Sequence, residues 1–201
     1  MARVPPLRIV GIGGTTKSAS STEQALVIAL ASAREAGADV HHFDGPFLAK
    51  LPHYGTEDAQ RSSEGSALLA AVRQADGVIL ASPGYHGSIS GLVKNAIDYL
   101  EETARDERVY LDGVPVGLIV TAYGWQATGS TLSTLRSIVH SLRGWPTPLG
   151  ITLNTAGVKL FDAQGQCLDA QVAASLKLLA EQVVNPASVF ARGNKKSELL
   201  L

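Results

Sequence analysis

The sequence predicts an α/β fold in which a five-stranded parallel sheet is covered by helices on both faces. Short apolar, β-branched segments alternate along the chain with longer segments whose apolar residues recur at helical spacing. One short segment, residues 77–81 (GVILA), is apolar on both faces, as strands inside a covered parallel sheet are. The chain has 201 residues, 45% hydrophobic and 17% charged, which is sufficient for one sizeable core.

The predicted strands are short and apolar, and the first of them ends in glycines. They are residues 7–12 (LRIVGI), 39–43, 77–81, 114–122 (VPVGLIVTA) and a part of 148–154. The second strand has the weakest apolar pattern of the set.

The predicted helices lie between these strands and show the apolar stripe of helices packed on a sheet. They occupy residues 21–35 and 63–74, a segment marked by Ile89, Leu92, Val93, Ala96, Ile97 and Leu100, another marked by Leu132, Leu135, Val139 and Leu142, and a last one marked by Leu168, Val172, Leu176, Leu179 and Val183. Residues 44–63 are long and rich in Gly, Pro and polar residues, so we expect a loop near the site.

Right-handed crossovers leave few topologies for this alternation. We predict a three-layer, doubly wound, flavodoxin-like sheet with strand order 2-1-3-4-5. In that order a ligand binds beyond the carboxyl ends of the strands, so the loops after residues 12 and 81 are the predicted site loops. No repeat or linker is visible, and we expect residues 1–201 to form a single domain. Its core would cover about 7–184, with a C-terminal tail at 185–201 that is loosely ordered or used in packing.

Composition excludes several classes of function. The net charge is −1 and the basic residues are scattered, which argues against a nucleic-acid partner. Cys167 is the only cysteine, so an internal disulfide cannot form. Pro5 and Pro6 interrupt any secretory signal, and no apolar run is long enough to span a membrane. We therefore expect a soluble, cytoplasmic protein. We expect no metal site, since His41 and His42 point to opposite faces of a strand.

The first site loop, residues 11–22 (GIGGTTKSASST), admits three phosphate-binding interpretations. The spacing of Lys17 and Ser18 suits a Walker P-loop, but Thr16 replaces its second glycine. The same threonine interrupts a G-x-G-x-x-G dinucleotide motif. The third and favoured interpretation is a monophosphate cradle of hydroxyl groups and Lys17 before a helix N-terminus. Part of the same segment also suits helix capping, with Ser21 or Thr22 as the N-cap.

The second site loop lies in residues 82–100 (SPGYHGSISGLVKNAIDYL). Its proline and glycines give a backbone that a flat ligand can approach closely, and Tyr85 and His86 add aromatic surface and hydrogen-bonding capacity. Together the two loops resemble those of the NADPH-dependent FMN reductase family. Residues 83–98 match that family's P-x-Y-[NH]-G-S-x-[PS]-G-x-[LV]-K-N-A-[IL]-D motif, which is the more specific signal. Residues 13–22 match its G-S-x-R-x-x-S-type loop, with Lys17 where arginine is common, and the resemblance covers about residues 7–183.

The resemblance implies FMN as the cofactor and NADPH or NADH as the co-substrate. It implies that the FMN phosphate is held by Thr15, Lys17, Ser20, Ser21 and Thr22. It implies that the ring and ribityl chain are contacted by Pro83, Gly84, Tyr85, His86 and Gly87. Residues 123–129 (YGWQATG) take the place of the family's third flavin contact, which adds Gly124 and Trp125. No side chain is assigned as catalytic, because hydride transfer from nicotinamide to flavin requires alignment rather than a base.

The expected activity is NAD(P)H-dependent reduction of FMN, with reduced flavin supplied to a flavin-dependent monooxygenase. Reduction of quinones, azo compounds or metal oxyanions is the alternative within the same enzyme class. A flavodoxin-type electron carrier and a flavin-binding regulator are the alternatives outside it, and the balanced charge argues against the carrier. The resemblance also implies a homodimer or homotetramer, with a dimer contact through residues 91–102.

Overall fold

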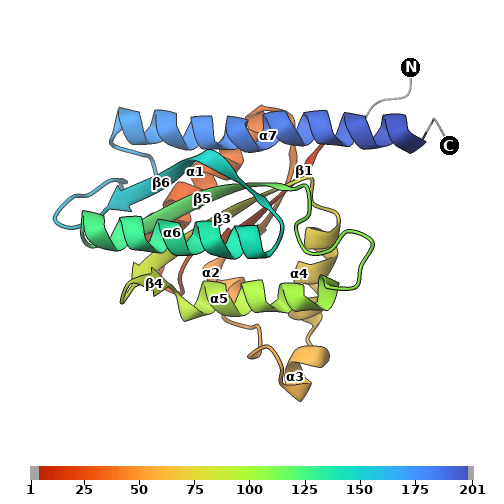
Figure 1. Cartoon of the computed structure of the whole chain (residues 1–201). Coiled ribbons are helices and arrows are strands. Elements are labelled where there is room, and N and C mark those ends of the chain that lie inside the picture. Colours follow the sequence, from red (N-terminus) through yellow and green to blue (C-terminus); the bar gives the residue numbers. More distant parts are fainter. Residues whose placement is uncertain (1–4, 199–201) are drawn as a thin grey trace.

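The computed structural model describes residues 5–198, and the side chains of residues 5–190. Its sheet contains five parallel strands, and Figure 1 shows helices covering both faces. The strands are β1 (Arg8–Gly13), β2 (Asp39–Phe43), β3 (Gly77–Tyr85), β5 (Pro115–Ala122) and β6 (Trp145–Asn154). Their order is β2-β1-β3-β5-β6, which confirms the predicted 2-1-3-4-5 order. A short further strand, β4 (Ser88–Ile89), pairs antiparallel with β3 and was not predicted.

The helices divide between the two faces of the sheet. Helices α1 (Ser21–Glu35) and α7 (Ala170–Glu198) cover one face, whereas α4 (Ser63–Arg73), α5 (Gly91–Asp98) and α6 (Trp125–Ser141) cover the other. A 3₁₀ helix, Tyr99–Thr103, continues α5. In the part of the chain that is described, no helix combines the length and apolarity that crossing a membrane requires.

The segment predicted as a loop at residues 44–63 contains two short helices, α2 (Gly45–Leu48) and α3 (Glu57–Gln60). Its beginning lies near the first predicted site loop, where Gly45 packs against the backbone of Thr15. Figure 1 shows α3 at the lower end of the molecule, well away from β4. Asn95 holds the intervening chain, since its Nδ2 donates to Pro52 O at 3.0 Å and its Oδ1 accepts from Tyr54 N at 2.9 Å. The expectation that the whole segment lies near the site was therefore wrong.

Alternating residues of each strand supply two separate cores, because successive side chains of a strand point to opposite faces. Val10 of β1 and Leu80 of β3 pack with α4, α5 and α6. Ile9 and Ile79, one position away in each strand, pack with α1 and α7. Both faces of the central strands are therefore buried.

Three glycines on the α1/α7 face allow these helices to approach the sheet closely. A Cβ atom at Gly11 would lie 2.5 Å from Leu30 Cδ1 of α1. At Gly77 and Gly117 it would lie 2.6 and 2.9 Å from the methyl groups of Val183 in α7. Side chains at these positions would overlap the helices, so the glycines set the separation between sheet and helices.

The C-terminal helix extends beyond the predicted end of the core. Asn185 and Pro186 resemble a helix stop, but α7 continues through them with Pro186 inside it. Ala187 is buried, and Phe190 packs edge-on against Trp145 of β6 with ring centroids 5.4 Å apart. The apolar contacts thus continue past the boundary predicted at 184, and residues 185–198 are helical. Of the two expectations for the tail, Ala187 and Phe190 support its use in packing over loose order. Residues 199–201 of the predicted tail lie outside the described residues.

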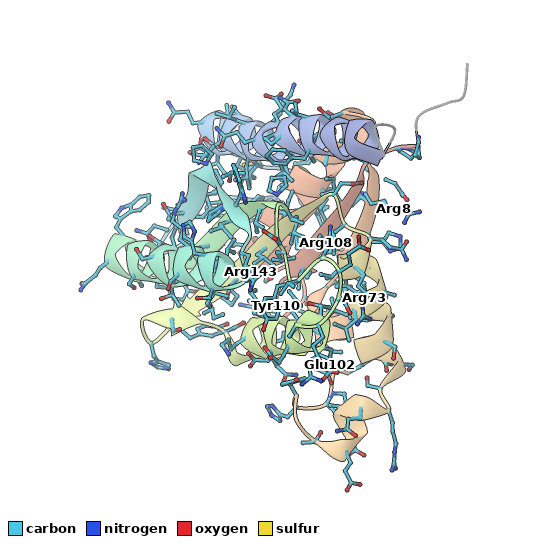
Figure 2. All side chains as sticks on the ribbon, turned by 45° about the vertical axis from the view of Figure 1, so that its right-hand side comes forward. Arg8, Arg73, Glu102, Arg108, Tyr110 and Arg143 are labelled. Carbon is cyan, nitrogen blue, oxygen red and sulfur yellow. The ribbon has the colours of Figure 1, made fainter. Side chains whose placement is uncertain are left out.

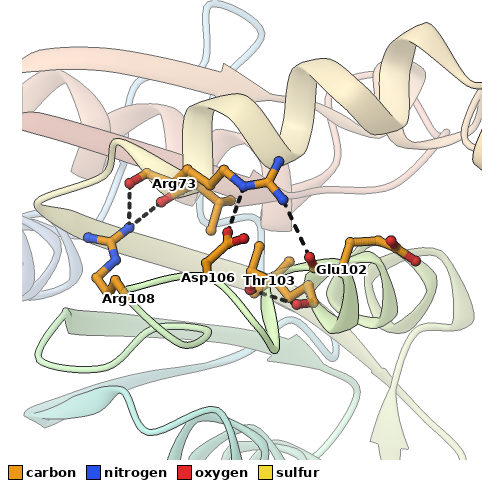
Figure 3. A network of polar contacts seen from close by, with 7 residues as sticks. Arg73, Glu102, Thr103, Asp106 and Arg108 are labelled. Carbon is orange, nitrogen blue, oxygen red and sulfur yellow. Dashed lines mark hydrogen bonds and ion pairs between the residues drawn. The ribbon is translucent and has the colours of Figure 1, made fainter.

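An arginine fastens the end of α4 to the chain that follows α5. Arg108 donates hydrogen bonds to the carbonyl oxygens of Val72 (2.5 Å), Arg73 (2.9 Å) and Ala75 (2.6 Å), as Figure 3 shows in part. These carbonyls lie at and just beyond the end of α4, where intrahelical donors are missing. Arg73 itself forms an ion pair with Asp106 at 2.7 Å. Figure 2 shows Arg73 and Arg108 on the side of the molecule away from β4.

Replacing Arg108 by methionine should lower the free energy of unfolding by about 2 kcal/mol, because a charged donor to three carbonyls is lost. The melting temperature should fall by about 4 to 8 °C for a chain of this size. The exposed Arg105, replaced in the same way, is the matched control and should change stability little. Equal melting temperatures for the two variants would contradict the assigned role.

Candidate functional site

The carboxyl ends of β1, β3, β5 and β6 lie at one edge of the sheet because these strands are parallel. This edge is on the left in Figure 1, where the N-termini of α6 and α7 also lie. Four loops meet there: residues 14–20, 86–87, 123–124 and 155–169. The first three contain residues predicted from the sequence, whereas the fourth was not recognised.

The first loop is pressed against the end of β3. Gly14 N donates to Ala81 O at 3.3 Å, and a Cβ atom at Gly13 would lie 2.2 Å from the same oxygen. The chain then turns, with Thr15 Oγ1 accepting from Lys17 N at 3.1 Å. Lys17 is exposed beyond this turn, so its ammonium group is available to an anion.

The N-cap of α1 is Ser20, which corrects the prediction of Ser21 or Thr22. Its Oγ accepts from Glu23 N at 3.2 Å, and its hydroxyl hydrogen remains able to donate. The amides of Ser21 and Thr22 precede the first intrahelical bonds and point out of the helix end. The hydroxyl of Thr22 is buried and lies 2.5 Å from Thr121 Oγ1 of β5. Thr22 can therefore offer its amide to a ligand at this end, whereas its side chain ties α1 to the sheet.

A polar pair lies behind this loop rather than in it: His42 Nε2 is 3.0 Å from Glu23 Oε1. Glu23 also fills the space where Gly14 lacks a side chain. Across the described residues, no three His, Cys, Asp or Glu side chains are grouped as metal ligands would be.

The second loop is a tight hairpin. Gly84 pairs with Ile89 and Tyr85 with Ser88, which leaves His86 and Gly87 as a two-residue turn. Both have positive φ, 51° and 84°, as a type I′ turn requires. Histidine tolerates this left-handed conformation better than most residues do. The identity of His86 is thus explained by the backbone, while its side chain and that of Tyr85 are exposed.

Buried hydroxyl groups hold the base of this hairpin. Ser82 Oγ accepts from Ser90 N at 3.0 Å, and Ser90 caps α5 by accepting from Val93 N at 3.2 Å. Pro83 is buried, and a Cβ atom at Gly84 would lie 2.6 Å from Thr131 Oγ1 of α6. Pro83 and Gly84 therefore position the hairpin against α6 and leave its tip in solvent.

The third loop adds two exposed aromatic side chains. Tyr123 is 78% and Trp125 67% exposed, and Tyr85 of the hairpin is 54% exposed. Gly124 lies between Tyr123 and Trp125 in the chain and has a φ of 104°. The space that a side chain would occupy at this position is open. We call Tyr85, Tyr123 and Trp125 the aromatic rim. Exposed rings of this size at a sheet edge are typical of a ligand or protein contact.

Asn154 at the end of β6 joins the third loop to the fourth. Its Oδ1 accepts from Gly124 N at 2.9 Å and from Ala156 N at 3.0 Å. The fourth loop, together with Tyr123 and the start of α1, borders an open pocket of about 580 Å³. The signal that could have found this loop is its position: it follows a strand that ends at the same edge.

The tyrosines with a raised pKa lie away from this edge of the sheet. Burial, and next a hydrogen bond to the Glu102 carboxylate, raise the pKa of Tyr54, and burial raises the pKa of Tyr99. Both tyrosines border the chain around α3. They mark a structural contact and give no candidate acid or base at the four loops.

Comparison with known proteins identifies a family. A family model described as NADPH-dependent FMN reductase matches residues 7–157. Similar curated proteins include the FMN-dependent NADPH-azoreductases of Staphylococcus saprophyticus (38% identical over 114 residues, 56% of this chain and 57% of the relative) and Staphylococcus haemolyticus (36% over 115 residues, 57% of each). The chain thus matches a little more than half the length of these relatives.

Two solved structures share the fold at low sequence identity. The flavoenzyme NAD(P)H:(acceptor) oxidoreductase FerB of Paracoccus denitrificans superposes with a TM-score of 0.71 at 19% identity, covering 90% of this chain and 97% of FerB. The apo form of the NADH:FMN oxidoreductase EMOB superposes with a TM-score of 0.67 at 19% identity, covering 88% and 90%. The flavodoxin-like fold predicted from the sequence is thereby confirmed.

Replacing His86 by valine should destabilise the protein by about 1 to 3 kcal/mol, because a β-branched residue is strained at positive φ. Replacing it by asparagine, which accepts this conformation, should leave stability close to that of the parent. Denaturant unfolding of both variants measures the difference. If asparagine cost as much as valine, the turn would not be the reason for a histidine here.

Proposed function

The chain belongs to the family of NADPH-dependent FMN reductases, and we propose accordingly that it reduces FMN with a reduced nicotinamide nucleotide. The observation that carries the proposal is the pairing, at one edge of the sheet, of an anion-binding helix end with an exposed aromatic rim. FMN has the matching parts: a phosphate at one end and a flat ring at the other. The acceptor of the electrons and the assembly of the protein are parts of the same proposal.

The donors of the first loop fit a phosphate. It would be held by side-chain donors of Thr15, Lys17, Ser20 and Ser21. The amides of Ser21 and Thr22 would add two backbone donors. A helix N-terminus favours an anion through its free N–H groups and its dipole. Because the hydroxyl of Thr22 already contacts Thr121, we assign Thr22 a contact through its amide alone.

The hairpin and the third loop fit the flat part of FMN. The tip of the hairpin would contact the ring and ribityl chain from one side through Tyr85, His86 and Gly87. Pro83 and Gly84 would hold the base of the hairpin in position. Gly124 and Trp125 would contact it from the other loop, where no side chain fills the space at Gly124. Bound FMN would accept a hydride equivalent from the nicotinamide and pass electrons to an acceptor. The residues named here bind and align the two reactants, and none is needed as a base.

Two acceptors are proposed for the electrons. The first is free flavin, which as reduced FMN would serve a flavin-dependent monooxygenase. The second is an azo compound or another small oxidant, and it is favoured by the curated relatives, which are named FMN-dependent NADPH-azoreductases. Both acceptors would use the same site, and they differ only in the molecule that enters after the oxidised nicotinamide has left.

We also propose that the chain is one FMN-binding domain that works as a cytoplasmic homodimer. The dimer contact would use α5, which with α6 borders a groove of about 340 Å³ containing Ile97, Ile138 and Leu142. A reducing compartment is consistent with a single cysteine, Cys167.

The purified protein should oxidise NADPH when FMN is present and consume little without it. Absorbance at the flavin and nicotinamide bands follows both reactants, and an azo dye added without oxygen tests the second acceptor. NADPH oxidation that is independent of flavin, or absent with FMN in excess, would contradict the proposed function. Bleaching of the dye that continues after unbound FMN has been removed would favour the azo compound over free flavin as the acceptor.

Replacing Lys17 by glutamine should raise the dissociation constant of FMN about tenfold, since a charge-assisted phosphate contact is lost. The affinity for riboflavin, which lacks the phosphate, should not change. Quenching of flavin fluorescence measures both constants. The exposed Lys50, replaced in the same way, is the matched control. An equal loss of affinity for FMN and riboflavin would place Lys17 away from the phosphate.

A further inference from the structure

The open pocket of about 580 Å³ adjoins the proposed flavin site and shares Ser21 and Tyr123 with it. It lies between the start of α1 and residues 155–163, with Tyr123 at its edge. Ser21 lines it and is also proposed to hold the FMN phosphate. Its volume falls within the range of cavities that hold small molecules, which is about 300–1,000 Å³. A ligand in this cavity would therefore be next to bound flavin.

The lining of the cavity offers one cationic side chain to a ligand. Lys159 and Asp162 are the charged residues that line it. The carboxylate of Asp162 is already engaged, because its Oδ1 accepts from Gln164 N at 2.9 Å and from Gln166 N at 2.8 Å. The ammonium group of Lys159 is exposed and forms no ion pair with a described residue. Lys159 is therefore the lining residue that can pair with an anion.

The chain that carries Lys159 is held firmly in place. Leu160 and Phe161, the next two residues, are buried in the core beneath α1 and α7. Two backbone bonds close the segment, from Leu168 N to Leu160 O at 2.8 Å and from Asp162 N to Gln166 O at 3.0 Å. The backbone at Lys159 is thus positioned before a ligand binds, which reduces the entropy lost on binding.

We propose that this cavity binds the adenosine half of the reduced nicotinamide nucleotide, with Lys159 pairing with one of its phosphates. The inference rests on the proposed function, which brings such a nucleotide to the adjacent flavin. The exposed ring of Tyr123 offers the adenine a stacking surface, and Gln24 and Thr155, which have no proposed contact with FMN, offer hydrogen bonds around it. Since Asn154 bonds both Gly124 and Ala156, the cavity and the third flavin loop are held as one unit.

Calorimetric titration with adenosine 2′,5′-bisphosphate and with adenosine 5′-diphosphate tests the cavity without turnover. Both should bind the parent protein. Lys159→Gln should weaken at least one of them about tenfold, while Lys159→Arg, which keeps the charge, should restore most of the affinity. A loss of affinity for the bisphosphate alone assigns Lys159 to the 2′-phosphate. A loss of affinity for both nucleotides assigns it to the diphosphate. Either result supports the proposal.

Steady-state kinetics provide the second readout. With FMN saturating, Lys159→Gln should raise KM for NADPH about tenfold and leave kcat and the dissociation constant of FMN unchanged. Lys177→Gln is the matched control, because Lys177 is an exposed lysine of α7 that does not line the cavity. Its constants should equal those of the parent.

Three results would overturn the proposal: no binding of either nucleotide to the parent, equal binding by the parent and Lys159→Gln, or a loss of FMN affinity in place of nucleotide affinity. The last would assign Lys159 to the flavin phosphate. Nucleotide binding that depends on Lys159 in a protein unable to oxidise NADPH would support the cavity and contradict the proposed function. The two failures are therefore distinguishable.

Discussion

The close approach of α1 and α7 to the sheet determines where the other parts of the molecule lie. Gly11, Gly77 and Gly117 have no side chains to separate the helices from the strands, and Leu30 and Val183 occupy that space. Because α1 lies this close, its first turn reaches the carboxyl ends of the central strands. The bond between the hydroxyls of Thr22 and Thr121 then fixes this turn to β5. The position of the N-terminus of α1, which we propose as the phosphate site, is thus set by packing inside the core.

Several polar residues of the two sequence motifs support the backbone, whether or not they also face the site. Ser20 caps α1, Ser90 caps α5, and Ser82 fastens the hairpin to the start of that helix. His86 occupies a left-handed position of a type I′ turn. Helix ends and tight turns need such residues because their amides and carbonyls lack regular partners. What these residues leave open to a ligand is a set of backbone amides, one exposed lysine and the aromatic rim.

The fourth loop gives the site a second compartment. Its wall is anchored by Leu160 and Phe161 in the core and closed by the bonds around Asp162. Asn154 connects it with Gly124, so the two compartments share one hydrogen-bonded support. The reductase activity that we propose would require the protein to hold a flavin and a nucleotide at the same time. Adjacent compartments on a shared support would meet that requirement.

The alternation of strands and helices, the strand order and the first two loops could be predicted from the sequence, because they depend on local periodicity and on right-handed crossovers. The sequence could not show whether a hydroxyl group of the first loop faces a ligand or supports the fold. Ser20 and Thr22 carry the same hydroxyl donor in both cases. The sequence placed the end of the core at about 184, because the contact between Phe190 and Trp145 that accompanies α7 beyond Pro186 joins distant residues. The fourth loop has no motif, and its cavity exists only where β6, α1 and Tyr123 meet. Contacts between segments far apart in the chain are decided by tertiary packing, so only the structure could place them.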